Sequence, residues 1–143
     1  MSFLWDSNII RHYIDDHPRL LKNLEHISRQ EILLPIVVVA EQLRGRSESI
    51  LKAEADQLAI AQERFNQTHV LLNQFQIFYL DKEALSVAAR LIKQVKTRKR
   101  YADVLVAAQV ISGNHILVTR NTKDFRDLLS PKQMQNWIDN DIR

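Results

Sequence analysis

YADVLVAAQVISGNHILVTRNTKDF, residues Tyr101 to Phe125, is the stretch that decides the fold. It predicts a nearly all-apolar helix just after Asp103, then a turn at Gly113-Asn114 and a short buried strand over Ile116–Val118. The strand ends in a polar, mixed-charge segment, Thr119 to Asp124. A buried strand that ends in this way presents polar groups at the edge of a core, and the other acids of the chain are candidates for the same edge.

Strands and helices alternate in the rest of the chain. Apolar runs predict three further strands, at Ser2–Trp5, Ile32–Leu34 and Gln76–Leu80. Helical spacing of apolar residues predicts helices over 7–16, 20–27, 35–44, 47–66 (continuing or restarting through 72), 82–96 and 131–137. This alternation predicts an α/β fold of three layers, with a parallel central sheet of four to five strands flanked by helices.

Capping residues set the predicted helix ends. Ser7 or Asn8 is expected to cap the first helix, and Gly45 is expected to end the helix from Pro35 as a left-handed cap. The capping box that starts at Ser130 predicts the last short helix. Leu51 and Leu85 fall on apolar faces and are expected in the core.

Composition favours a single globular domain spanning residues 1–143, with 45% apolar and 26% charged residues. The absence of cysteine excludes a disulfide framework, thiolate metal sites and a cysteine nucleophile. No apolar run has the length needed to cross a bilayer, and the N-terminus lacks the basic start of a signal peptide. We therefore expect a cytoplasmic protein with no membrane partner.

Basic residues gather in three places, although the net charge is only +3. They are Arg44 and Arg46; Lys96, Arg98, Lys99 and Arg100; and Arg120, Lys123 and Arg126. Any one cluster is most simply a solvated surface run. Three clusters beside acids favour an anionic partner.

Five polar residues follow or adjoin strand ends, and each has a structural interpretation. Asp6 and Asp103 are candidates for helix N-caps, and Glu41 for a solvent-facing pair with an arginine three residues on. Asn121 is a candidate cap of a short helix, with Asp124 in its first turn. Glu41 and Asp103, however, interrupt apolar runs that read as buried, and buried carboxylates need partners.

Because carboxyl ends of parallel strands meet at one edge, the acids are expected to converge there. Carboxylates about 5 Å apart repel by roughly 3 kcal/mol at an effective dielectric near 20, so such a site needs either a compensating cation or raised pKa values. Mg²⁺ prefers oxygen ligands and pairs them with phosphate. A site of this kind, rimmed by arginine and lysine, suits metal-assisted phosphodiester hydrolysis.

Four segments of the sequence resemble those of a known family. LWDSN with Asp6, VVVAEQLRG with Glu41, ADVLVAAQV with Asp103, and LVTRNTKDF with Asn121 and Asp124 occur in the order typical of PIN-domain ribonucleases. The chain is similar in particular to the VapC-like toxins of bacterial toxin–antitoxin pairs. The resemblance implies a PIN-like sheet flanked by helices, an endoribonuclease dependent on Mg²⁺ or Mn²⁺, a homodimer, and inhibition by a small cognate antitoxin.

The resemblance also implies roles for individual residues. Asp6, Glu41 and Asp103 would bind the metal, and Asn121 or Asp124 would complete the catalytic set, with Asn121 standing where the family often has an acid. Ser7 or Asn8 would hydrogen-bond the acids. Residues expected to hold the RNA backbone are Arg44, Arg100, Arg120 and Lys123. The chain departs from the family in the basic loop KTRKRYA before Asp103 and in the valines at 37–39.

Two other functions stay open. One is a housekeeping PIN-domain nuclease that processes RNA without an antitoxin. The other is a non-catalytic PIN domain that binds RNA or a partner protein, which the neutral Asn121 permits. A response-regulator receiver is disfavoured, because Asp6 lacks the adjacent acid that its phosphorylation site needs, even though Asp81 follows the third strand.

Overall fold

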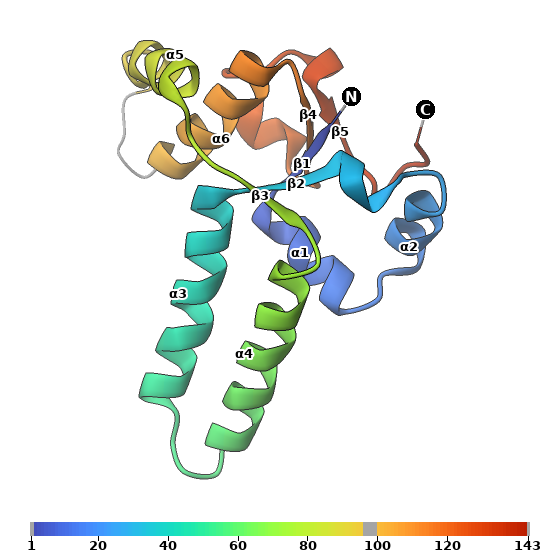
Figure 1. Ribbon diagram of the computed structural model, residues 1–143, viewed down its shortest axis with the longest axis vertical. Helices are drawn as coiled ribbons and strands as arrows, with labels where there is room; N and C mark the ends of the chain where they lie inside the picture. Colours follow the sequence, from blue (N-terminus) through green and yellow to red (C-terminus); the bar gives the residue numbers. More distant parts are fainter. Residues whose placement is uncertain (1, 96–99, 143) are drawn as a thin grey trace.

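Five short parallel strands form one sheet in the computed structural model, which describes residues 2–95 and 100–142 (Figure 1). They are β1 (Phe3–Trp5), β2 (Ile32–Pro35), β3 (Gln76–Phe78), β4 (Ile116–Val118) and β5 (Met134–Gln135). Their order across the sheet is β3-β2-β1-β4-β5, and every neighbouring pair is parallel. The predicted α/β class with a parallel central sheet is confirmed.

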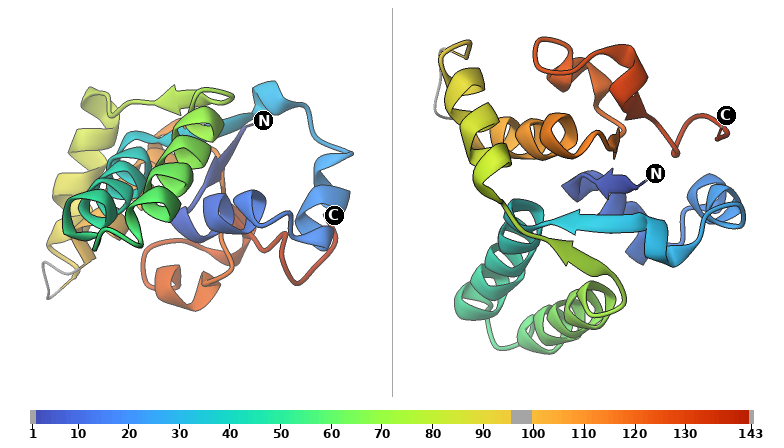
Figure 2. Two further views of the ribbon diagram at one scale, coloured as in Figure 1. Left: turned by 90° about the horizontal axis from the view of Figure 1, so that it is seen from below. Right: turned by 45° about the horizontal axis from the view of Figure 1, so that its top comes forward.

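Helices cover both faces of this sheet. They are α1 (Ser7–Ile14), α2 (Pro18–Leu24), α3 (Ile36–Lys52), α4 (Leu58–Leu72), α5 (Lys82–Ile92) and α6 (Tyr101–Gly113), with 3-10 turns η1 (Arg29–Glu31), η3 (Thr122–Phe125) and η4 (Pro131–Gln133). The pair α5 and α6 lies on one side, and α1 with the α3–α4 hairpin lies on the other (Figure 2). None of the helices in the described part of the chain combines the length and apolarity needed to cross a membrane.

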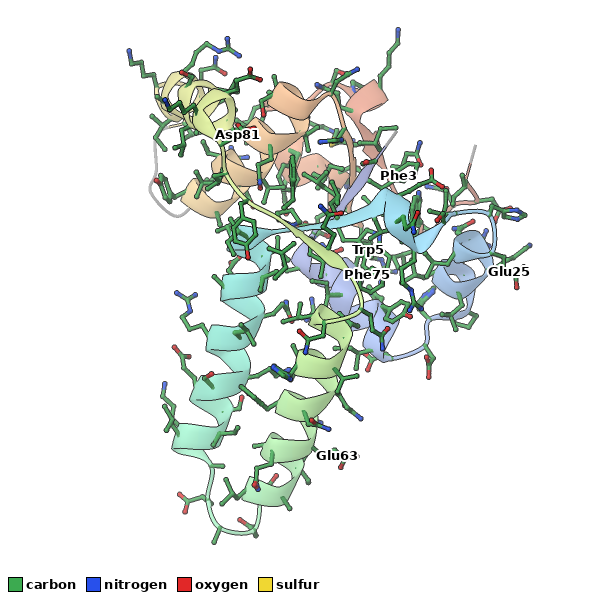
Figure 3. The ribbon with its side chains drawn as sticks, viewed as in Figure 1. Phe3, Trp5, Glu25, Glu63, Phe75 and Asp81 are labelled. Carbon is green, nitrogen blue, oxygen red and sulfur yellow. The ribbon has the colours of Figure 1, made fainter. Side chains whose placement is uncertain are left out.

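The strands are apolar because both of their faces are covered. All residues of β1 and β2 are buried. Trp5 lies between aromatic neighbours, with its ring centroid 5.0 Å from that of Phe75 and 5.5 Å from that of Tyr13. Figure 3 shows Trp5 and Phe75 side by side where β1 and β3 approach α1. This aromatic cluster fixes the central strand on which the candidate site is built.

Strand order reverses between β1 and β4. The chain adds β2 and β3 on one side of β1, then crosses back to place β4 on the other side. Parallel sheets bind ligands outside the carboxyl ends of the strands at such a reversal. Asp6 directly follows β1 and Thr119 directly follows β4, so polar groups stand at this point.

Two predicted helix boundaries are wrong. Gly45 does not end a helix, because α3 runs on to Lys52 and no glycine in the described residues has a positive φ. The chain instead turns over residues 53–57 and returns as α4. Because β2 and β3 are parallel, the chain between them must return to the end of the sheet at which both strands begin. The helical spacing of apolar residues is regular along this connection and therefore does not indicate where the chain turns back. Leu51, predicted in the core, is 83% exposed at the tip of this hairpin.

Two more predictions fail for tertiary reasons. Ser130 does form its capping box, but only the turn η4 follows, and the chain then enters β5 instead of a helix. Met134 pairs with Leu117 of β4, so ladder hydrogen bonds override the local helix signal. Leu85 lies on the outer face of α5 and is 51% exposed.

The C-terminal segment is fastened to α2 by one buried side chain. Asn23 donates to the carbonyls of Trp137 and Asn140, both at 2.9 Å, and accepts from the backbone N–H of Ile142 at 3.0 Å. We expect Asn23→Leu to lower the free energy of unfolding by about 1–3 kcal/mol, because it strands these backbone groups. Urea unfolding measures this, with exposed Asn73→Leu as the matched control. An Asn23→Leu protein as stable as that control would contradict the fastening role.

Candidate active site

Asp6 has two tasks at the end of β1. Its Oδ1 accepts from the backbone N–H of Ser7 at 2.9 Å, so Asp6 caps α1, a position predicted for Ser7 or Asn8. Its Oδ2 accepts from the Thr119 hydroxyl at 2.8 Å and from Asn8 Nδ2 at 3.2 Å. The cap interpretation is therefore right for Asp6, and the second oxygen holds it against the end of β4.

Thr119 is a site residue that the sequence analysis missed. It is fully buried, and it lies beside Asp6 because the register pairs Trp5 with Val118 one residue earlier. Its oxygen also accepts from the backbone N–H of Asn121 at 3.1 Å. A hydroxyl directly after a buried strand, level with an acid after the neighbouring strand, is the signal that could have identified it.

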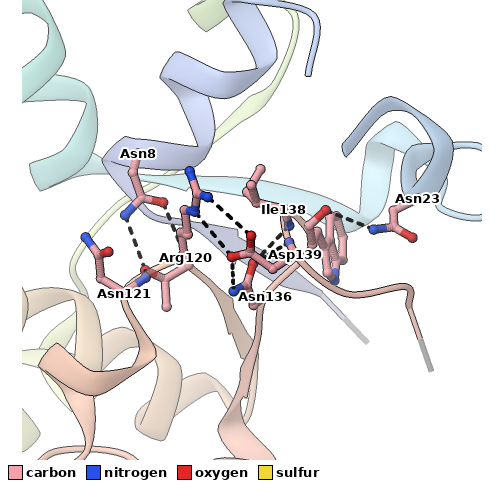
Figure 4. A network of polar contacts seen from close by, with 9 residues as sticks. Asn8, Asn23, Arg120, Asn121, Asn136, Ile138 and Asp139 are labelled. Carbon is pink, nitrogen blue, oxygen red and sulfur yellow. Dashed lines mark hydrogen bonds and ion pairs between the residues drawn. The ribbon is translucent and has the colours of Figure 1, made fainter. Parts of the chain in front are cut away.

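Asn8 links Asp6 to the segment after β4. Its Nδ2 donates to Asp6. Its Oδ1 accepts from the backbone N–H of Arg120 at 3.2 Å (Figure 4). Asn8 is buried, and both its amide nitrogen and its amide oxygen are hydrogen-bonded within the protein. Ser7 contacts Asp6 through its backbone N–H and not through its hydroxyl. These contacts fix the carboxylate of Asp6 in one orientation.

Glu41 and Asp103 come from helices that begin or end at the same edge of the sheet. Glu41 lies in the second turn of α3, which starts directly after β2, and it is exposed where the sequence predicted burial. Asp103 lies in the first turn of α6, which leads into β4. Arg100 holds the N-cap position of α6, so the cap interpretation of Asp103 is wrong.

Neighbouring carboxylate charges contribute to the pKa shifts of the acids. Burial is the main cause that raises the pKa of Asp103 to about 6, and the Asp6 charge is the next, with smaller contributions from Asp124 and Glu41. Burial and then the Asp6 charge raise the pKa of Glu41, while Arg44 lowers it. Four acids from distant parts of the chain thus face one region.

Hydrogen bonds moderate the same effect at Asp6. Burial raises its pKa, and the charge of Asp124 adds to the increase. The bonds from Thr119, Ser7 and Asn8 act in the opposite direction, because they favour the ionised form. Asp6 is therefore the acid whose charge the protein stabilises most directly.

The donor set fits a hard divalent cation. Within residues 2–95 and 100–142, no three His, Asp or Glu side chains stand close enough to hold a metal ion by themselves. Mg²⁺, however, needs only one or two carboxylates, since waters and substrate phosphate fill its remaining positions. A pKa of about 6 at Asp103 caused partly by neighbouring charges is an unfavourable arrangement that such a cation relieves.

Arg100, predicted to bind substrate, is occupied within the protein. Its guanidinium group pairs with Asp127 and donates to the backbone carbonyl of Asp124, and its Nε lies 3.9 Å from Asp103 Oδ2. Arg100 thereby ties the start of α6 to η3. The other predicted members of this basic loop, Lys96, Arg98 and Lys99, lie outside the described residues.

Arg120 is also paired inside the protein. Its Nε and Nη2 donate to the two carboxylate oxygens of Asp139, each at 3.2 Å, and Asn136 holds the same carboxylate at 2.8 Å (Figure 4). The hydrogen bond from Asn136 and that from Arg120 lower the pKa of Asp139. Arg44 stands near enough to Glu41 to lower its pKa, and Lys123 is exposed at the start of η3.

The position after β4 that completes the acid set has two candidates. Asn121 occupies the N-cap position of η3 without a side-chain cap bond, and it is exposed. Asp124 lies in the first turn of η3, and its charge raises the pKa of both Asp6 and Asp103. By this electrostatic contribution Asp124 belongs with Asp6, Glu41 and Asp103 to one group of four acids, the acidic cluster.

Comparison with solved structures gives the same fold in VapBC structures and in a toxin–antitoxin complex. A chain of VapBC2 from Rickettsia felis, bound to a promoter DNA fragment, has 22% identity and a TM-score of 0.73 over 96% of this chain and 99% of its own. A chain of VapBC-1 from Haemophilus influenzae has 16% identity and a TM-score of 0.73 over 96% and 98%. A toxin–antitoxin complex from Klebsiella pneumoniae has 19% identity and a TM-score of 0.69 over 99% and 100%.

Family assignment comes from the sequence of residues 3–128, which matches the PIN domain family. No curated protein matches the chain. The match begins at β1 and ends after η3, so it includes all four acids of the cluster. The chain belongs to the PIN domain family.

Proposed function

We infer that this protein is a divalent-metal-dependent endoribonuclease, and that it is the toxin of a toxin–antitoxin pair. The observation that carries the inference is the gathering of acids from four parts of the chain at the reversal of strand order, where burial and then neighbouring charges raise the pKa of Asp103 to about 6 and also raise that of Glu41. PIN family membership supports a nuclease.

Each residue of the cluster has a proposed role. Asp6, Glu41 and Asp103 hold the cation, and Asp124 supplies the further charge that Asn121 lacks. When bound, Mg²⁺ or Mn²⁺ polarises the phosphate and activates water for in-line attack. Thr119 and Asn8 orient Asp6, and Arg44 and Lys123 stand where they can hold the RNA backbone.

Partners are proposed from the structural neighbours. One of them is described as a toxin–antitoxin complex, and two are described as VapBC2 or VapBC bound to DNA. These descriptions support a small antitoxin that binds and inhibits this chain. A homodimer is proposed with it. A short open reading frame for a DNA-binding protein beside the gene would support the pairing, and its absence would favour a housekeeping nuclease.

Cleavage of RNA tests the proposed chemistry. Purified protein should cut a single-stranded RNA with Mg²⁺ or Mn²⁺ and lose activity in chelator. Glu41→Gln should lower the rate roughly a hundredfold or more, because removal of a metal ligand exceeds the 10- to 100-fold cost of removing a residue that only orients a ligand. Glu41 makes no hydrogen bond to a described residue, so folding should be unaffected.

Asp81→Asn is the matched control, since Asp81 caps α5 away from the acidic cluster and asparagine can also cap. Its activity should equal that of the native protein. RNA binding without cleavage in any divalent metal would overturn the nuclease and favour a binding domain. A fully active Glu41→Gln protein would remove Glu41 from the metal site.

A further inference from the structure

A groove of about 310 Å³ opens beside Glu41. It is lined by Ser7, Arg11, Glu41, Gln42, Gly45 and Arg46, where α1 packs against α3. Ser7 follows Asp6 directly, so the groove begins at the acidic cluster. A larger hollow of about 770 Å³ lies along β5, and none of the four acids lines it. The smaller groove is therefore the one that continues the candidate active site.

Arg46 is held in place on one wall of this groove. Its Nε donates to the hydroxyl of Thr68 at 3.1 Å, and Thr68 is fully buried on α4. This bond uses one of the five N–H donors of the guanidinium group and restricts its orientation. A cation whose orientation is fixed before binding loses less entropy when it contacts an anion.

Arg11 supplies a second cation on the opposite wall. It lies on α1 one turn after Ser7 and is exposed. No hydrogen bond or ion pair joins its side chain to the part of the chain that the structure describes. Arg100 and Arg120 differ in this respect, because Asp127 and Asp139 already neutralise them.

Gly45 keeps the groove open to the helix backbone. A Cβ atom built on Gly45 meets no atom within 4 Å, so no packing within the protein requires glycine here. Its φ is also not positive, so the backbone conformation does not require glycine either. A glycine inside a helix lowers helix stability. Glycine at this position leaves open space on this wall of the groove.

We propose that this groove binds the sugar–phosphate backbone of RNA next to the scissile bond, with Arg11 and Arg46 on phosphates and Thr68 as the positioning residue of Arg46. This RNA site rests on the proposed nuclease function, since the bound RNA would lie between the groove and the carboxylates. Phosphate is the favoured anion because both walls present arginine, which matches phosphate in a forked geometry.

Salt-dependent binding tests it. A labelled single-stranded RNA is titrated in chelator, where no cleavage occurs, with the native protein and Arg11→Ala/Arg46→Ala. Each arginine removed should weaken binding roughly tenfold. The plot of log binding constant against log salt concentration should become less steep by about 0.7 for each phosphate that is no longer neutralised by an arginine. Arg90→Ala/Lys93→Ala removes the same charge from the α5 region and should change neither quantity appreciably.

Variants at two further positions separate the effect of the groove from that of charge alone. Gly45→Leu should raise the melting temperature, because it strengthens α3, and yet weaken RNA binding, because it fills the groove. Thr68→Val should weaken binding without lowering the salt slope, and Thr68→Ser should restore it. Unchanged binding in the double arginine variant or in Gly45→Leu would overturn the proposal.

Failure of the groove and failure of the nuclease give different results. If the native protein cuts RNA with Mg²⁺ and the double arginine variant keeps its KM and salt slope, the groove proposal is wrong and the nuclease stands. If nothing is cut but the arginine variants bind RNA more weakly with the reduced slope, the groove stands as an RNA site. In an active protein, the variant should raise KM more than it lowers kcat.

Discussion

Asp103→Asn should abolish RNA cleavage and stabilise the metal-free protein at neutral pH. The pKa of Asp103 is raised from 3.8 to about 6, so the folded state binds this proton more tightly than the unfolded state. Ionised Asp103 therefore lowers the free energy of unfolding as pH rises from 4 to 6, and the destabilisation persists at higher pH. Because the side chain is 37% exposed, asparagine should recover only about 1 kcal/mol.

Thermal unfolding in chelator from pH 4 to 8 measures this effect. The gain from Asp103→Asn should be full above pH 6 and shrink as the pH falls to 4, because the folded state then becomes protonated while the unfolded state, with a pKa of 3.8, is only partly ionised. Asp56→Asn, in the exposed turn of the α3–α4 hairpin, should show no such trend. Cleavage should fall roughly a hundredfold or more, as expected when a metal ligand is removed. Full activity in a folded Asp103→Asn protein would exclude the proposed role.

Thr119→Val should damage both stability and the pH dependence of activity. Valine fills similar volume in this fully buried position but cannot donate to Asp6 Oδ2 or accept from the N–H of Asn121. We expect the free energy of unfolding to fall by about 1–3 kcal/mol. Removal of the hydroxyl also takes away the largest opposing cause at Asp6, so the pKa of Asp6 should rise further and the acidic limb of the pH–rate profile should move to higher pH.

Urea unfolding and pH–rate profiles give the two readings. Thr119→Ser retains the hydroxyl and should restore the native profile even where it leaves a small cavity. A Thr119→Val protein with the native pH profile would show that the hydroxyl does not set the charge of Asp6.

The sequence predicted the parallel sheet well because its central strands are short apolar runs followed at once by polar residues. Asp6, Glu41, Asp103 and Asp124 could be placed at one edge for that reason, since topology alone brings strand ends together. Gly45 misled the prediction of α3, because glycine ends many helices but here faces a groove. β5 could not be seen, because its two residues become a strand only through pairing with β4.

The fine structure of the site depended on pairings with no sequence signal. Arg100 and Arg120 read as free basic residues, yet their partners Asp127 and Asp139 lie 27 and 19 positions further on. Asp6 was predicted to be either a cap or a site acid. It performs the first with one oxygen and is held by Thr119 through the other. The two oxygens of a carboxylate allow one residue to cap a helix and to take part in a site at the same time. The spacing of residues in the sequence does not reveal this double role.

Strand order also bears on when the site comes into being. Asp6 and Thr119 are 113 positions apart, and β4, which brings them together, is synthesised after β1, β2 and β3. A growing chain can assemble β1, β2 and β3 with their helices while the central strand still lacks its other neighbour. Asp103 and Asp124 reach the acids on β1 and α3 only when β4 closes that long loop, at an entropic cost that grows slowly with its length. For the nuclease proposed here, this means that a nascent chain on the ribosome has no complete acidic cluster until β4 and η3 have been synthesised.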